Sequence, residues 1–193
     1  MSADELTVAE VDADRWDDLV TLFGPSGAYS GCWCMWWRLS GKEFGANGNP
    51  GNRAALEQIV AHGRPAGLLA YQANVPVGWA SVAPRPDFPR LSRSRTLGLD
   101  RDADPEVWSV PCFFIARRHR GAGVATALLR AAVDHVRDQG GRVLEGYPTD
   151  VGEERKPSAD LFTGTPSLFA KAGFTVHARP SSGRRLVVRR DLS

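Results

Sequence analysis

A short stretch rich in arginine and glycine, residues 118–123 with the sequence RHRGAG, has the composition of an anion-binding turn. It follows an apolar run typical of a buried strand, and the residues after it repeat apolar side chains at helical spacing. The N–H groups at a helix start carry partial positive charge, and glycine lets the backbone approach phosphate oxygens closely. This pattern predicts a pyrophosphate site, although glycine pairs before a helix also occur in ordinary strand-to-helix turns.

A second candidate site is the aromatic stretch within residues 27–51, a segment otherwise rich in glycine and asparagine. Aromatic faces can hold a flat or cationic group, and an arginine can bind a carboxylate or phosphate on the same ligand. The alternative is that the tryptophans cover an open part of the core. The residues concerned are Trp33, Trp36, Trp37 and Arg38.

Three cysteines, Cys32, Cys34 and Cys112, are the residues that would suggest a metal or redox site. A structural zinc ion needs four ligands, and no second pair of cysteines or histidines stands at a familiar spacing. Three thiols are also too few for the disulfide framework of a secreted protein. We therefore expect no metal, reduced thiols and a cytoplasmic location.

The elements that must position these residues follow from the periodicity of the apolar side chains. Alternation and apolar runs predict strands, whereas repeats at three and four residues, with N-caps and glycine stops, predict helices. Their order indicates one mixed α/β domain over residues 1–193, in which about four helices flank a mostly antiparallel sheet. Strands are expected at residues 6–11, 66–73, 77–83, 107–116, 142–147, 174–178 and 185–190, and helices at residues 12–23, 52–62, 121–139 and 165–173.

The composition is that of an ordinary globular protein, with 42% hydrophobic and 24% charged residues. The formal net charge is only +2, which gives little support to nucleic-acid binding. No apolar run has the length of a membrane span, and the first residues lack the basic and apolar regions of a signal peptide. We expect neither a nucleic acid nor a membrane among the partners.

The glycine-rich stretch and residues 168–174, with the sequence LFAKAGF, together resemble the GNAT superfamily of acyl-CoA-dependent N-acyltransferases. The resemblance implies a sheet splayed between its fourth and fifth strands, and a strand, turn and helix over residues 108–140 that bind coenzyme A. In that superfamily the strand pairs with the pantetheine arm and the turn holds the pyrophosphate. The residues at these positions are Phe113, Phe114 and Ile115 in the strand and Arg118, His119, Arg120, Gly121, Ala122, Gly123, Val124 and Ala125 in the turn and helix.

The resemblance also implies acetyl-CoA as the donor and a primary amine, on a small molecule or a peptide, as the acceptor. Glu145 is the candidate general base, because its strand borders the gap and its neighbours Leu144 and Gly146 would leave it partly desolvated. The alternative is a glutamate that faces solvent or pairs with an arginine. Tyr147 is the candidate general acid, since Phe169 stands where many members of the superfamily carry a tyrosine.

Phe169 cannot donate a proton, which keeps open a protein that binds CoA as a sensor or regulatory module without transferring an acyl group. Direct attack with water in place of a protein acid is also compatible with the sequence. Nucleotide binding at the same turn has less support, because no Gly-Lys-Ser/Thr follows to handle a triphosphate. Dimers are frequent in the superfamily, which leaves a homodimer open for this chain.

Overall fold

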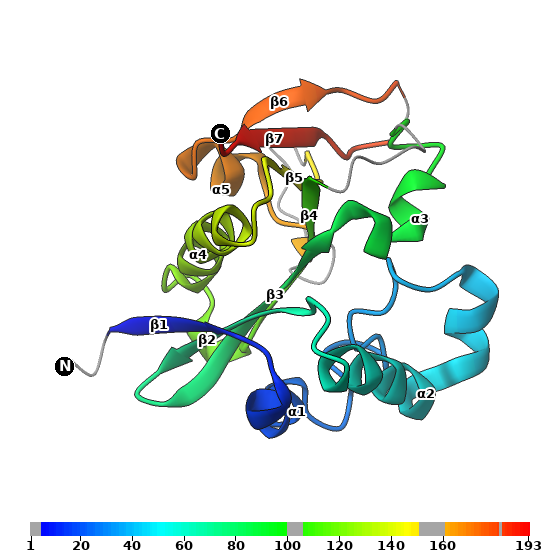
Figure 1. Ribbon diagram of the computed structural model, residues 1–193, viewed down its shortest axis with the longest axis vertical. Coiled ribbons are helices and arrows are strands. Elements are labelled where there is room, and N and C mark those ends of the chain that lie inside the picture. Colours follow the sequence, from blue (N-terminus) through cyan, green and yellow to red (C-terminus); the bar gives the residue numbers. More distant parts are fainter. Residues whose placement is uncertain (1–4, 100–105, 151–160, 182) are drawn as a thin grey trace.

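The computed structural model describes residues 5–99, 106–150, 161–181 and 183–193, and in these residues seven strands form one sheet (Figure 1). The strand order is β1-β2-β3-β4-β5-β7-β6, and all neighbours are antiparallel except the parallel pair β4 and β5. The mixed α/β class predicted from the sequence is thus confirmed. The strands are β1 (Leu6–Glu10), β2 (Gly67–Gln72), β3 (Val75–Pro84), β4 (Val107–Ile115), β5 (Val143–Gly146), β6 (Thr175–Ala178) and β7 (Val187–Asp191). The helices are α1 (Trp16–Phe23), α2 (Gly41–Ala61), α3 (Pro89–Ser92), α4 (Val124–Asp138) and α5 (Pro166–Lys171), with short 3-10 turns η1 (Ala13–Arg15), η2 (Arg85–Asp87) and η3 (Arg117–His119).

The two faces of the sheet carry different layers of helices. On β3, Ala80 packs in a cluster with α4 and α5, whereas its neighbour Trp79 packs in a cluster with α1 and α2. Successive side chains of a strand point to opposite faces, so the two clusters lie on opposite sides of the sheet. Figure 1 shows α4 and α5 together on one side and α1 and α2 on the other.

The parallel pairing of β4 and β5 ends well before β4 does. The last pair is Val110 with Gly146, while β4 continues to Ile115. The pairing of β3 with β4 slips by one residue at the same level, a β-bulge that holds Pro111, which has no N–H to donate. β4 and β5 therefore part at their carboxyl ends, as the resemblance to N-acyltransferases implied.

Helix α2 begins eleven residues before the predicted start at Asn52, so that boundary was wrong. The Ser40 side chain accepts a hydrogen bond from the Glu43 N–H, and the Glu43 carboxylate accepts one from the Ser40 N–H. This capping box starts the helix, and a kink at Gly48, with φ of 56° and ψ of −163°, accommodates Pro50. None of the helices in the described residues has both the length and the hydropathy needed to cross a membrane.

Candidate functional site

The glycine-rich turn presents unobstructed backbone at the start of α4. Gly121 and Gly123 have φ of 79° and 80°, in the left-handed region that favours glycine. Gly123 is the N-cap of α4 and has no side chain, so the first N–H groups of the helix lack a side-chain acceptor. Apart from the adjoining backbone, no atom of the described residues lies within 4 Å of the place where a Cβ would stand on either glycine. The turn is therefore open to an anion at the positive end of a helix.

Polar contacts tie this turn to the ends of β2 and β4. The Arg120 side chain donates from Nε to the Ile115 carbonyl at 3.1 Å, and His119 Nδ1 lies 2.9 Å from Gln72 Oε1. Arg118 is exposed beside them. The arginines and His119 predicted to surround a pyrophosphate are thus brought together with the two glycines.

The edge of β4 beyond the β5 pairing runs toward this turn. The Phe113 N–H donates to the Phe162 carbonyl at 2.6 Å, whereas the Ala116 N–H donates to Val77 in β3 at 2.9 Å. Because backbone groups alternate along a strand, those of Phe113 and Ile115 face away from β3 and those of Phe114 face Trp79 within the sheet. Of the three residues predicted to pair with pantetheine, two present backbone groups at this edge.

Glu145 lies at the centre of a buried network of hydrogen bonds. Both its oxygens accept from Arg85 Nη1 at 3.2 Å, and Oε1 accepts from Arg189 at 2.7 Å. The Tyr147 hydroxyl donates to Oε2 at 2.8 Å and lies 2.8 Å from Ser109 Oγ. Glu145, Tyr147 and Ser109 have no exposed surface. Glu145 is therefore paired with arginine, which is the alternative that the sequence left open, and its role as a base stays a prediction.

Tyr147 is held in its protonated form by this environment. Burial, and then the negative charge of Glu145, raise the pKa of the Tyr147 hydroxyl well above its ordinary value. Its proton is engaged by the Glu145 carboxylate. Its role as a general acid stays a prediction, and the geometry gives the hydroxyl a structural partner.

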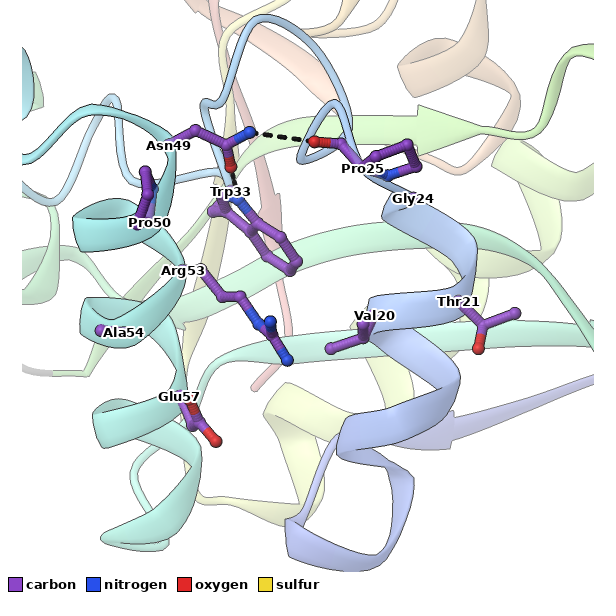
Figure 2. Close-up of a pocket in the computed structure, with 10 residues that line it drawn as sticks. All are labelled: Val20, Thr21, Gly24, Pro25, Trp33, Asn49, Pro50, Arg53, Ala54 and Glu57. Carbon is purple, nitrogen blue, oxygen red and sulfur yellow. Dashed lines mark hydrogen bonds between the residues drawn. The ribbon is translucent and has the colours of Figure 1, made fainter.

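Trp33 forms the floor of an open groove between α1 and α2 (Figure 2). The groove has a volume of about 740 Å³, and Arg53 on its α2 wall lies with its guanidinium carbon 5.7 Å from the centre of the Trp33 ring. The Trp33 indole N–H donates to Asn49 at 2.6 Å, and Asn49 in turn donates to the Pro25 carbonyl. Trp33 is thus packed as part of the core with one edge at the groove.

The other three residues of the aromatic stretch enter different surroundings. Trp36 is 41% exposed and contacts Arg90, whereas Trp37 is buried. Arg38 is also buried, and its Nη2 donates to the carbonyls of Pro65 and Ala66 at 3.0 and 3.2 Å. The four residues predicted as one acceptor surface therefore have different contacts, and the Arg38 guanidinium donates to the protein's own carbonyls.

Arg185 is a residue for which the sequence suggested no role. Its guanidinium carbon lies 5.2 Å from the centre of the Trp37 ring and 5.6 Å from that of Phe162. Phe162 is the residue whose carbonyl accepts from Phe113 at the β4 edge. No periodicity or motif signals such a contact, because it joins residues that are far apart in the chain.

Two of the cysteines meet in the core. Cys34 Sγ lies 3.3 Å from Cys112 Sγ, and both side chains are buried. The hydrogen bond with Cys34, together with burial, raises the pKa of the Cys112 thiol, and burial raises that of Cys32 to about 11. Within the described residues, no three His, Cys, Asp or Glu side chains gather in a way that could hold a metal ion.

Known proteins provide an independent comparison with this geometry. A model of the acetyltransferase (GNAT) family matches residues 33–163. No curated protein matches the chain in sequence. Its fold is similar to that of YncA from Salmonella typhimurium with its cofactor acetyl-CoA, at 16% identity over 97% of this chain and 94% of that one, with a TM-score of 0.56.

Two further solved structures share the fold at similarly low identity. One is a GCN5-related N-acetyltransferase from Kribbella flavida, at 17% identity over 99% of this chain and 100% of that one, with a TM-score of 0.58. The other is the ribosomal-protein-S18-alanine N-acetyltransferase from Escherichia coli, at 12% identity over 98% and 95% of the two chains, with a TM-score of 0.51. At these identities the likeness is one of fold.

Proposed function

Because the chain belongs to the acetyltransferase (GNAT) family, we propose that it moves the acetyl group of acetyl-CoA to a primary amine. The observation that carries this proposal is the open turn at Gly121 and Gly123, which starts α4 next to the outer edge of β4. YncA, whose fold is similar, is described with acetyl-CoA as its cofactor. The S18-alanine enzyme is named for an amine acceptor.

In this proposal the backbone N–H groups from Arg118 to Ala125 hold the pyrophosphate, and Arg118 adds positive charge. The pantetheine arm pairs with β4 through the backbone groups of Phe113 and Ile115, which face that edge. For that pairing the Phe113 N–H must exchange the carbonyl of Phe162 for a carbonyl of the arm. Residues 108–140 then form the whole CoA-binding unit.

The proposed chemistry is direct transfer within a ternary complex. The neutral amine nitrogen attacks the thioester carbonyl carbon, the C–S bond breaks, and the nitrogen loses a proton while the CoA thiolate gains one. Phe169 is buried against Phe113 and Phe174 and offers no proton. The Tyr147 hydroxyl donates to Glu145. These contacts support water as the proton carrier, and they support Glu145 as a residue that positions β5 and its arginines.

Isothermal titration with acetyl-CoA tests the donor half of the proposal, and Gly123→Ala is the informative variant. A left-handed alanine costs about 1–2 kcal/mol of stability, and its methyl group obstructs the phosphate side of the turn. We expect affinity for acetyl-CoA to fall about tenfold or more. Gly140→Ala is the matched control, since Gly140 has φ of 78° and similar open space but lies at the far end of α4. Equal affinity losses in both variants, or no binding to the folded wild type, would contradict the proposal.

A second candidate function is CoA binding without transfer, and the phenyl ring of Phe169 is the observation that favours it. Release of free thiol from acetyl-CoA over a panel of amines separates the two. Turnover on any amine above the rate without amine supports the transferase. Tight CoA binding with no turnover across the panel supports a sensor or regulatory module.

A further inference from the structure

Among the residues that the structure describes, arginines outnumber carboxylates around the end of β5. Arg85 and Arg189 both pair with the single carboxylate of Glu145. Arg185 has no ion-pair partner among the residues that the structure describes. Burial lowers the pKa of the Arg185 guanidinium. This end of the sheet therefore has positive charge that the described residues do not neutralise.

Buried hydrogen-bond donors without acceptors lie in the same region. The Trp37 indole N–H and the Nε groups of Arg85 and Arg185 are shielded from solvent and have no partner in the described residues. Trp37 is 4% exposed and packs in one buried cluster with Tyr147. Buried polar groups are nearly always paired in folded proteins, so these donors need an explanation.

The geometry points to one small site. The Arg185 guanidinium lies over the rings of Trp37 and Phe162, at 5.2 and 5.6 Å from their centres. These ring contacts attract the charge of the guanidinium, but the rings provide no ordinary hydrogen-bond acceptor for its N–H groups. Phe162 also contacts the β4 edge through its carbonyl and the Phe113 N–H. Phe162 thus connects the Arg185 guanidinium to the edge where the proposed thioester would lie.

We infer that Arg185 and the indole N–H of Trp37 bind the carboxylate of the acceptor, so that the enzyme acetylates amines that carry a carboxylate, such as amino acids. A planar carboxylate accepts in the plane of a guanidinium and still has lone pairs for a neighbouring N–H. Arg38, the arginine that the sequence suggested for such an anion, is closed off by backbone carbonyls. The inference rests on the proposed acetyl transfer and specifies its substrate class.

The kinetic test compares each L-amino acid with its carboxamide as acceptor, with release of CoA thiol as the readout. We expect the amino acids that react to exceed their amides about 10- to 100-fold in kcat/KM, because charge-assisted hydrogen bonds are lost in the amide. Arg185→Ala should raise KM for the acids, bring the ratio close to one and leave the affinity for acetyl-CoA unchanged. Trp37→Phe keeps a ring under the guanidinium and removes the N–H, so it should reduce the ratio only in part.

The matched control is Arg179→Ala, which removes an exposed arginine that precedes the same last strand and pairs with Asp150 at 3.6 Å. It should leave the ratio unchanged. Amides that react as well as acids in the wild type would overturn the inference while the proposed transfer survives. If no amine raises thiol release above the rate without amine, the proposed function is removed, and the binding measurement on Trp37 still decides the carboxylate site.

That direct measurement is the NMR resonance of the Trp37 indole N–H, identified by its absence in Trp37→Phe. Titration with L-amino acids, with CoA present, should move this resonance saturably, and titration with the carboxamides should not. An indole resonance that none of the acids moves would overturn the inference whatever the activity. A larger response to phosphoethanolamine than to any amino acid would overturn the carboxylate assignment, and so would equal responses to acid and amide.

Discussion

At the scale of single residues, the side chain with the largest structural consequence is Glu145. It has no exposed surface and it receives hydrogen bonds from two guanidinium groups and a phenol. Removing one partner of a buried ion pair leaves the other charge desolvated and unpaired. The structure therefore gives Glu145 a task in folding that exists with or without a task in catalysis.

We predict that Glu145→Gln lowers the free energy of unfolding by about 3 kcal/mol or more, because Arg85 then lies buried without a counterion. Urea unfolding measures this change. Asp134→Asn is the control, since Asp134 pairs with Arg137 on the surface of α4 and should cost less than about 1 kcal/mol. A Glu145→Gln protein as stable as the control but strongly impaired in turnover would instead favour the general base. Loss of activity alone does not separate the two roles.

Tyr147 leads to a prediction about pH. Its pKa is raised in the folded protein by burial and by Glu145, so the folded state keeps a proton that the unfolded state loses. The stabilising contribution is complete below the ordinary tyrosine pKa of about 10 and is lost as pH rises through and above that value. We predict that the melting temperature of the wild type falls between about pH 9 and 11, and that the melting temperature of Tyr147→Phe falls less steeply over the same range.

Part of the fall in melting temperature should remain in Tyr147→Phe, because the raised pKa values of the Cys32 and Cys112 thiols also make the folded state less stable as pH rises. Cys112→Ala therefore provides a second variant with a shallower slope. A Tyr147→Phe profile parallel to that of the wild type would contradict the assigned network.

At the scale of elements, the parts of the fold with strong apolar periodicity could be predicted from the sequence. β4 and α4 were expected at nearly their observed positions, because one is a continuous apolar run and the other repeats apolar residues at helical spacing. The first half of α2 could not be found this way, since glycine and asparagine dominate it and few of its side chains are buried. Its only local signal is the capping box at Ser40 and Glu43.

We predict that Ser40→Ala lowers the free energy of unfolding by about 1 kcal/mol, because the Glu43 N–H loses its acceptor at the start of α2. Chemical denaturation measures the change. Ser26→Ala, at an exposed position of the same connecting region, is the control and should stay within about 0.5 kcal/mol of the wild type. If the two variants are equally stable, the first half of α2 contributes little to folding.

The candidate site likewise has a part that could be predicted from the sequence and a part that could not. The glycine turn is a local feature, so residues 118–123 contain nearly all the information about its shape. Arg38 and Arg185 show what the local sequence does not reveal, because both are arginines close to aromatic residues. The Arg38 guanidinium is enclosed by the carbonyls of Pro65 and Ala66. Arg185 has no ion-pair partner among the described residues. Their difference depends on contacts between residues that are distant in the chain, which no spacing visible in a single sequence reveals.

At the scale of the whole molecule, the two sides of the proposed site are joined through the core. Cys34 comes from the segment between α1 and α2, and Cys112 comes from β4, next to the edge proposed for pantetheine. The exposed fractions of these side chains are 4% and 8%. A thiol reagent can therefore reach them only after the packing of α1, α2 and β4 has opened. Their reactivity reports the stability of the structure around the site.

We predict that Ellman's reagent labels Cys34 and Cys112 at the rate of this opening, and that acetyl-CoA at about 100 times its Kd slows labelling about 100-fold. The reason is mass action: a ligand that binds only the closed state lowers the population of the open state by the factor 1 + [L]/Kd. Protein unfolded in urea, in which all three thiols react at once, is the control for reagent and ligand.

Unchanged labelling of a protein that binds acetyl-CoA by calorimetry would mean that the segment between α1 and α2 opens on its own. The aromatic stretch would then move independently of the β4 edge, whereas slowed labelling makes donor binding and the acceptor side of the sheet parts of one cooperative unit.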